Sequence, residues 1–271
     1  PEMKMSSDAT TVSSDKDLDI PALCKYAESK GIGLMVYVNQ RALVQQLDIL
    51  LPLYKKWGLK GIKFGFVQIG NQRWSTWLHD AVRKCGEYNL MVDIHDEYRP
   101  TGFSRTYPNL MTQEGIRGNE EMPDATHNTT LPFTRYLAGA GDYTLCYFNN
   151  RVKNTKAHQL AMAAVYYSPL QFMFWYDRPE FYQGEEELEF WKAIPSVWDD
   201  SRALDGEIGE YIVQARRSGN DWFVGAMTNT EARTITLTTD FLEPGKKYML
   251  HLYEDDDKLK DRKSTRLNSS H

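Results

Sequence analysis

Apolar runs of helical and of strand-like pattern alternate three times between residues 19 and 94. The runs that predict helices are 20–30, 42–57 and 74–88, and those that predict strands are 34–38, 62–67 and 90–94. The helical runs repeat apolar residues three and four apart, and glycines end the first two of them. Helices and strands that alternate about every thirty residues are typical of βα units around a parallel sheet.

Further helix and strand patterns follow this region. They are 130–140 with 144–148, then 158–167 with 170–176, and a last helix at 190–197. About five parallel strands fit a TIM-type (β/α)8 barrel without its first two or three strands. They also fit an open, doubly wound sheet. A glycine-rich phosphate loop after the first strand would favour the open sheet, but neither GxGxxG nor GxxxxGK[ST] occurs in the chain.

The pattern changes to short alternating runs beyond residue 203. These runs are 211–216, 222–228, 233–238 and 248–253, with turn residues between them. They predict an antiparallel β module that is shorter than the ~100 residues of a full β-sandwich. The expected organisation is a polar lead-in at 1–18, a partial barrel at 19–202 and a truncated β-sandwich module at 203–260. Residues 261–271 (DRKSTRLNSSH) match a translated sequencing adapter, so we expect them not to be native.

The composition excludes several classes of function. The 37 acidic residues exceed the 32 basic ones, which gives a net charge of −5 and argues against nucleic acid as a partner. No run approaches the ~18 apolar residues of a membrane span. Cys24, Cys85 and Cys146 are odd in number and widely spaced, so we expect buried thiols and neither a disulfide framework nor a zinc site. No feature of the sequence indicates a protein partner.

The segment 90–121 is the strongest candidate for chemistry. Its apolar strand pattern ends in His95, Asp96 and Glu97, and polar groups at strand ends form the active sites of α/β barrels. The segment holds six carboxylates, which are Asp93, Asp96, Glu97, Glu114, Glu120 and Glu121. Hydrolysis of a glycosidic bond needs two carboxyl groups, and crowded carboxylates favour a hard cation such as Ca²⁺. A solvated acidic loop would show the same pattern, and spacing does not choose between Glu120 and Glu121.

Four short motifs in this segment resemble motifs of a known family. DIHDEY, RPTG, RTYPNL and EGIRGNEE resemble the catalytic segment of glycoside hydrolase family 97, a family of α-glucosidases and α-galactosidases of Gram-negative carbohydrate-utilisation systems. The similarity runs from about residue 19 to about residue 254. It implies a (β/α)8 barrel between two β domains, a catalytic Ca²⁺ and a periplasmic or secreted location. The N-terminal β domain would lie outside this chain together with one calcium ligand, so we expect the chain alone to be inactive and poorly stable.

The resemblance also implies roles for single residues. The family's general acid falls on Glu120, and a calcium ligand falls on Glu114. A residue that serves as base and calcium ligand falls on Asp96. Because Asp is shorter than the usual Glu, the adjacent Glu97 is a second candidate for the base. The implied metal ligands are therefore Asp96, Glu114 and Glu120, and we expect Asp93 to be structural.

Two departures from the family pattern bear on mechanism. Retaining members carry a nucleophilic Asp in a Lys-x-Asp-Phe context, where this chain has Gly65 between Phe64 and Phe66. A residue without a side chain cannot attack, so we expect inversion, with the two carboxyl groups roughly 6.5 to 9.5 Å apart. Inverting members also offer a Glu at an earlier strand end, where Asn39 and Gln40 stand here. Only one region is then left to supply the base.

Five further residues are candidates for substrate binding. They are His95, Arg99, Arg105, Tyr107 and Trp175. Each of them could instead be a structural residue, as a partner of the acidic cluster or as part of the core. The expected function is hydrolysis of terminal α-linked sugars from an oligosaccharide or another α-glycoside, as by an α-glucosidase. An α-galactosidase and a non-catalytic sugar-binding barrel are the alternatives.

Overall fold

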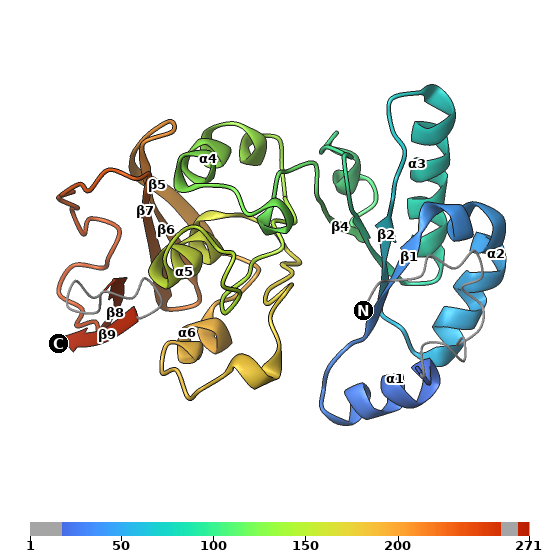
Figure 1. Cartoon of the computed structure of the whole chain (residues 1–271), viewed down its shortest axis with the longest axis horizontal. Coiled ribbons are helices and arrows are strands. Elements are labelled where there is room, and N and C mark those ends of the chain that lie inside the picture. Colours follow the sequence, from blue (N-terminus) through green and yellow to red (C-terminus); the bar gives the residue numbers. More distant parts are fainter. Residues whose placement is uncertain (1–17, 256–264, 271) are drawn as a thin grey trace. The chain divides into compact units, whose positions relative to one another are not determined.

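The structure, a computed structural model, describes residues 18–255 and 265–270. It divides into two compact units, Pro1–Ile116 and Arg117–His271 (Figure 1).

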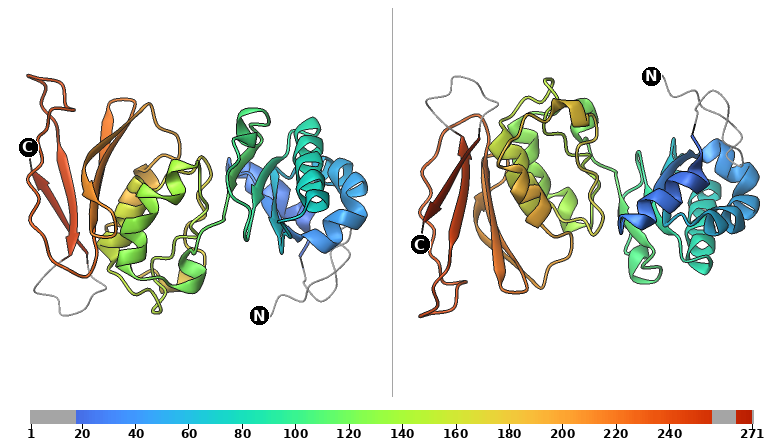
Figure 2. Two further views of the ribbon diagram at one scale, coloured as in Figure 1. Left: turned by 90° about the horizontal axis from the view of Figure 1, so that it is seen from above. Right: turned by 90° about the horizontal axis from the view of Figure 1, so that it is seen from below.

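The first unit contains one parallel sheet. Its strands are β1 (Met35–Asn39), β2 (Gly61–Gly65), β3 (Met91–Ile94) and β4 (Leu110–Gln113). The helices of the unit are α1 (Ile20–Ser29), α2 (Gln40–Trp57), α3 (Gln72–Glu87) and the 3₁₀ helix η1 (Phe103–Arg105). The strands lie in the sheet in the same order as in the chain. Helices α2 and α3 connect the first three strands and lie on one side of the sheet (Figures 1 and 2).

Capping residues begin and end these helices where the sequence predicts. The side chain of Asn39 accepts a hydrogen bond from the backbone of Ala42 at 3.1 Å, and Asn71 does the same for Trp74 at 3.0 Å. Gly58 ends α2 with φ of 91°, a left-handed conformation that favours glycine. The three helices predicted for this unit are confirmed to within two residues at each end.

The two faces of the parallel sheet differ in polarity. Val38, Ile62, Phe64, Val92 and Ile94 are buried in one apolar core together with residues of α2 and α3. The opposite face carries polar side chains that are neighbours across the strands, which are Tyr37, Lys63, Asp93 and Thr112. A doubly wound sheet has helices on both faces and reverses its strand order. The order of these four strands and their helices on one face agree instead with a segment of a (β/α)8 barrel.

The strand predictions beyond residue 94 need correction. Strand β4 was not predicted, because its sequence Leu-Met-Thr-Gln mixes apolar and polar residues over only four positions. The runs 144–148 and 170–176 are not strands in the structure. They lie side by side, since Leu145 N donates to Phe172 O at 2.8 Å and Trp175 N donates to Leu145 O at 3.0 Å. Thr144 and Phe174 have φ of 57° and 59°, and these left-handed residues interrupt the extended backbone that a ladder needs.

The helices of the second unit are short. They are the α-helices α4 (Ala125–Thr130), α5 (Lys156–Val165) and α6 (Leu188–Ala193), and the 3₁₀ helices η2 (Asn119–Glu121), η3 (Leu131–Phe133), η4 (Arg135–Leu137) and η5 (Pro179–Phe181). The helix predicted at 158–167 is confirmed as α5. The one predicted at 130–140 is wrong, because Thr134, with φ of −127° and ψ of −87°, separates two 3₁₀ turns there. The helix predicted at 190–197 ends at Ala193.

An antiparallel sheet packs against α5 in this unit. It consists of β5 (Asp200–Glu207), β6 (Tyr211–Ser218) and β7 (Asp221–Thr228). At Gly225 the strand comes so close to α5 that a Cβ atom would lie 2.7 Å from the carbonyl oxygen of Ala161. Arg216, which is buried, donates hydrogen bonds to the carbonyl oxygens of Ala164 and Val165 at 2.7 and 2.8 Å. The end of α5 is therefore fixed to the sheet.

The β module differs from the prediction in its strands. Strand β5 was not predicted, and the strand predicted at 233–238 is wrong, since residues 233–239 form no strand. A separate two-stranded sheet pairs β8 (Leu250–Asp255) with β9 (Thr265–Ser270). Strand β9 falls in the tail that we expect not to be native. That expectation also covers residues 261–264 and 271, which lie outside the described residues, and it stays a prediction.

Cys24, Cys85 and Cys146 are free and buried, as predicted. No helix in the described part of the chain is both long enough and apolar enough to cross a membrane.

Candidate active site

Strands β3 and β4 bring two of the predicted site residues together. His95 follows β3 and Glu114 follows β4, and the carboxyl ends of adjacent parallel strands lie at one edge of the sheet. The His95 Nδ1 atom lies 2.7 Å from Glu114 Oε2. The same oxygen accepts a short hydrogen bond from the backbone N–H of Asp96. Both side chains are buried, with 5% of His95 and 6% of Glu114 exposed, so the contact is shielded from solvent.

Asp96 connects this pair to the neighbouring strand. Its carboxylate oxygen Oδ2 accepts a hydrogen bond from Val67 N, in the loop after β2, at 2.8 Å. Its backbone has φ of 66°, the left-handed region that non-glycine residues seldom adopt and that is enriched at functional sites. Asp96 is half-buried, whereas Glu97, the second candidate for the base, is exposed. The carboxylate of Asp96 is therefore held in a fixed position at the sheet edge.

The structure gives Gly65 an unexpected neighbour. A Cβ atom built on Gly65 would lie 1.9 Å from both Cζ and Oη of Tyr37. The phenol of Tyr37, from β1, thus fills the space into which a side chain at position 65 would project. The Tyr37 ring also meets the His95 ring edge-on, with the centroids 6.0 Å apart. Sequence reasoning missed Tyr37, although its place two residues before the end of β1 puts it on the polar face of the sheet.

The remaining predicted residues of this unit lie in the loop between β3 and β4. Arg99 and Arg105 are exposed, and Tyr107 is half-buried. The Tyr107 ring packs against Phe103 with the centroids 4.8 Å apart. Tyr107 thus has a packing contact, and the two arginines present their guanidinium groups to solvent.

In the second unit, the structure separates the two acids between which spacing could not choose. Glu121 is exposed, and its Oε2 lies 2.9 Å from Nε of Arg117 in an ion pair. Glu120 is half-buried in η2. The preceding Asn119 anchors this turn, because its backbone N–H donates to Tyr143 O at 3.0 Å and its amide donates to Gln159 at 2.9 Å. Glu120 is therefore the half-buried acid of an anchored turn, whereas Glu121 is an exposed acid engaged with Arg117.

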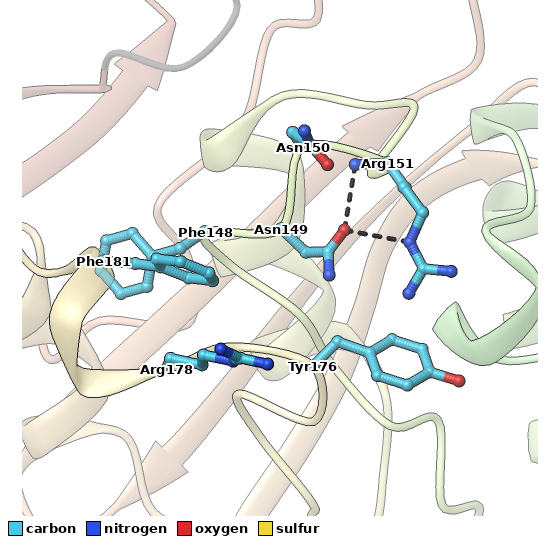
Figure 3. Close-up of a pocket in the computed structure, with 7 residues that line it drawn as sticks. All are labelled: Phe148, Asn149, Asn150, Arg151, Tyr176, Arg178 and Phe181. Atoms are coloured by element: carbon cyan, nitrogen blue, oxygen red, sulfur yellow. Dashed lines mark hydrogen bonds between the residues drawn. The ribbon is translucent and has the colours of Figure 1, made fainter. Parts of the chain in front are cut away.

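A pocket of about 400 Å³ lies in the same unit (Figure 3). It is lined by Phe148, Asn149, Asn150, Arg151, Tyr176, Arg178 and Phe181. Burial raises the pKa of Tyr176, and the nearby negative charge of Glu120 raises this pKa further. Trp175, which was predicted to bind substrate, is not among the lining residues, whereas the adjacent Tyr176 is. The sequence signal that could have revealed the pocket is the polar Asn-Asn-Arg directly after an apolar run.

The donor atoms at the sheet edge suit a hard cation in part. Asp96 and Glu114 offer carboxylate oxygens, the ligands that Ca²⁺ prefers. One oxygen of each already accepts backbone hydrogen bonds, which fixes the carboxylate and directs its second oxygen. Ca²⁺ takes six to eight oxygens, so these two residues could supply only part of a calcium shell.

The chain is similar to known proteins over most of its length. The family model described as "Glycoside hydrolase 97" matches residues 2–116, and the one described as "Glycosyl-hydrolase 97 C-terminal, oligomerisation" matches residues 197–271. A protein of Bacteroides thetaiotaomicron named "Retaining alpha-galactosidase" is 33% identical over 89% of this chain and 39% of its own length. The chain thus spans less than half of that relative.

Solved structures agree with this similarity. A glycoside hydrolase family 97 enzyme from Pseudoalteromonas sp. strain K8, in a variant bound to panose, superposes with a TM-score of 0.86 and 30% identity. The same enzyme bound to acarbose gives a TM-score of 0.86 and 31% identity. Each match covers 97% of this chain and 46% of the solved one.

Proposed function

The chain belongs to glycoside hydrolase family 97, and on that premise we propose that it forms part of an enzyme that hydrolyses terminal α-glycosidic bonds. The observation that carries this proposal is the buried contact of Glu114 with His95 and with the backbone of Asp96. Carboxylates fixed at the carboxyl ends of parallel strands are what a barrel glycosidase needs.

We assign the general acid to Glu120 and the general base to Asp96. The acid protonates the leaving oxygen, and the base activates the water that attacks the sugar. Support for Glu120 over Glu121 comes from the ion pair with Arg117, which already engages Glu121 at the surface. Support for Asp96 comes from its hydrogen bond to Val67, which holds the carboxylate in place. Glu97 is exposed and stays the alternative base.

We propose Ca²⁺ as the cofactor, held by Asp96, Glu114 and Glu120. When bound, the ion would neutralise the crowded carboxylates and polarise oxygen atoms of the substrate. His95 would orient Glu114 through the contact at Oε2. The relatives are more than twice as long as this chain, and we expect other parts of the full-length protein to contribute further ligands.

We further propose that the reaction inverts the anomeric configuration. This departs from the curated relative, whose name says "retaining". The reason is local: Gly65 has no side chain that could form a covalent intermediate, and Tyr37 occupies the adjacent space. A single displacement by water then needs only the acid and the base.

The sugar that is cleaved has two candidates. We propose an α-glucoside first, and an α-galactoside is the alternative that the name of the curated relative favours. We also propose that the protein acts in the periplasm or is secreted. The description of the family model that matches residues 197–271 includes oligomerisation. No feature of the sequence indicated such a protein partner.

The test is hydrolysis of aryl α-glucoside and aryl α-galactoside by the full-length protein. Glu120→Gln should lower kcat by about 10² to 10⁴, because it removes the proton donor. The matched control, Glu121→Gln, should keep kcat within about threefold of the parent. Sugar binding without turnover of either substrate by the parent protein would contradict the proposal and support a binding protein.

The proposed inversion of the anomeric configuration is tested separately. Proton NMR of the first sugar released from an α-glycoside should show the β-anomer before mutarotation. Release of the α-anomer would refute inversion and leave the assignment of Glu120 as acid intact.

A further inference from the structure

The pocket of the second unit has the size of a small-ligand site. Its volume of about 400 Å³ falls within the range of known ligand pockets. Two segments line it, 148–151 and 176–181. Figure 3 shows the two phenylalanine rings, Phe148 and Phe181, at one end and the side chains of Arg151 and Tyr176 at the other.

The charge of the pocket is positive. Arg151 and Arg178 both line it, and within residues 18–255 neither guanidinium forms an ion pair with a carboxylate. Asp177 belongs to the second of these segments, and its carboxylate is turned to the backbone that leads into the first. It accepts hydrogen bonds from the N–H groups of Tyr147 and Phe148, the latter at 2.9 Å. The pocket therefore presents two guanidinium groups that form no ion pair within the described part of the chain.

One of these cations is held in place. The Arg151 guanidinium lies 4.6 Å from the centre of the Tyr176 ring, and its Nε donates to Asn149 Oδ1 at 3.3 Å. The same amide oxygen accepts from Arg151 N at 3.0 Å. A guanidinium with a fixed plane is suited to a carboxylate or sulfate, which it binds with two parallel hydrogen bonds.

The other lining groups are suited to a sugar ring. Phe148, Phe181 and Tyr176 offer flat apolar surfaces, and Asn149 and Asn150 offer amides that bond to hydroxyl groups. A neutral sugar would use these groups and leave the two guanidinium groups without a partner. A free inorganic anion would use the guanidinium groups and leave the rings without one. A charged sugar uses both sets.

We propose that this pocket binds an anionic sugar residue, bearing a carboxylate or a sulfate, on the leaving-group side of the scissile bond. The position relative to the bond rests on the proposed function, in which Glu120 protonates the leaving oxygen. Geometry supports this position, because the turn that holds Glu120 is fixed by the hydrogen bond from Asn119 N to Tyr143 O at 3.0 Å, and the segment 143–148 leads directly to Phe148 in the pocket.

The ligand class is tested by calorimetric binding to the full-length protein. The probes are glucuronic acid, glucose 6-sulfate, glucose and inorganic sulfate. At least one of the two charged sugars should bind about tenfold or more tightly than glucose and than inorganic sulfate. Which of them binds identifies the anionic group. Equal affinity for the charged sugars and glucose, or equal affinity for the charged sugars and inorganic sulfate, would overturn the inference.

Substitutions assign the effect to the pocket. Arg178→Met and Arg151→Met should each reduce the preference for the charged sugar by about tenfold. Lys153→Met is the matched control, because Lys153 is an exposed cation of the same loop that does not line the pocket. It should leave the preference unchanged. A preference that survives in the double variant Arg151→Met, Arg178→Met would place the anion elsewhere and overturn the inference.

A separate measurement tests the position. α-Glucosyl disaccharides that end in glucuronic acid or in glucose are compared by kcat/KM, and the acid should be preferred by about tenfold. Hydrolysis of both at equal rates would overturn the leaving-group assignment while the proposed function stands. Binding of the charged sugar without hydrolysis of any α-glycoside would overturn the proposed function. The calorimetric result would still show which class of ligand the pocket binds.

Discussion

At the scale of single residues, Gly65 and Tyr37 depend on one another. The phenol of Tyr37 lies where a side chain on Gly65 would begin, with Cζ and Oη 1.9 Å from an ideal Cβ position. Any side chain at position 65 must therefore displace the ring. The space that a carboxylate side chain at position 65 would occupy is therefore filled by the ring of Tyr37.

This dependence predicts a coupled effect on stability. Gly65→Ala should lower the free energy of unfolding by about 1–3 kcal/mol, the usual cost of overpacking a well-packed site. The cost should persist in a Tyr37→Phe background, where Cζ remains, and should vanish in a Tyr37→Ala background. Urea unfolding of the variants measures it as a double-mutant cycle. An equal cost in the Phe and Ala backgrounds would show that the ring does not oppose the new methyl group.

At the scale of elements, β2 and β3 share a buried ion pair on the polar face of the sheet. Lys63 Nζ lies 2.9 Å from Asp93 Oδ2, and 3% and 0% of the two side chains are exposed. The strands place these residues opposite each other in register. Asp93, which we expected to be structural, thus has a structural partner.

Breaking this pair should be costly. Asp93→Asn should destabilise the protein by about 3–5 kcal/mol, because the charge of Lys63 then stays buried without its counter-charge. Replacing both residues, as Lys63→Met with Asp93→Leu, should cost less than Asp93→Asn alone. Asp48→Asn is the control, since the Asp48–Lys84 pair has Asp48 76% exposed and should contribute about 0–1 kcal/mol. Chemical unfolding measures all three, and a double variant less stable than Asp93→Asn would contradict the argument.

Helix α5 carries a buried histidine that makes stability depend on pH. Burial lowers the pKa of His158 from 6.5 to about 4. Since the folded-state pKa is the lower one, His158 favours the folded state above pH 6.5. That contribution is lost as the pH falls from 6.5 through 4. The difference between the two pKa values corresponds to about 3 kcal/mol.

We expect His158→Gln to flatten the dependence of unfolding free energy on pH between 6.5 and 4. In this window the unfolding free energy of the parent should fall with decreasing pH more steeply than that of the variant. The difference in slope should correspond to at most one bound proton, or about 1.4 kcal/mol per pH unit. His251→Gln, at an exposed histidine, should keep the slope of the parent. Urea unfolding at several pH values decides this, and parallel curves for the parent and His158→Gln would refute it.

The elements also show how far the sequence predicts this structure. Helices α1, α2 and α3 follow from periodic apolar residues and local caps, which depend only on neighbours in the chain. Strand β4 and the runs 144–148 and 170–176 depend on distant partners and on left-handed residues such as Thr144 and Phe174, which composition does not reveal. The alternation at 233–238 is that of a strand, but a strand needs a pairing neighbour, which local pattern cannot supply.

The site shows the same division. His95 and Glu114 were predicted because each follows a strand-like or motif sequence, and the sheet brings them to 2.7 Å. Tyr37 and the pocket residue Arg151 were missed, because their roles arise only when separate segments meet. A pattern along the chain can point to single residues at the end of an apolar run, but it does not show which two loops meet to line a pocket.

At the scale of the whole molecule, we expect calcium bound at the proposed site to stabilise the fold. An ion that binds the folded state and not the unfolded state stabilises it by about 2.7 kcal/mol at a hundred times its Kd. The full-length protein should therefore unfold several degrees higher in Ca²⁺ than in a chelator. Mg²⁺ should raise the Tm less, since it demands stricter geometry and keeps its water.

Variants at the sheet edge test which residues bind the ion that raises the Tm. Glu114→Gln and Asp96→Asn each keep an oxygen that can accept the hydrogen bonds from Asp96 N and Val67 N, so the local fold should survive. Both lose the negative charge that attracts the cation, and the difference in Tm between Ca²⁺ and chelator should fall to near zero. Glu121→Gln should keep the full difference, because its carboxylate pairs with Arg117 at the surface. A parent protein with the same Tm in both solutions would exclude a stabilising calcium site, and a full shift in Glu114→Gln would place the ion on other residues.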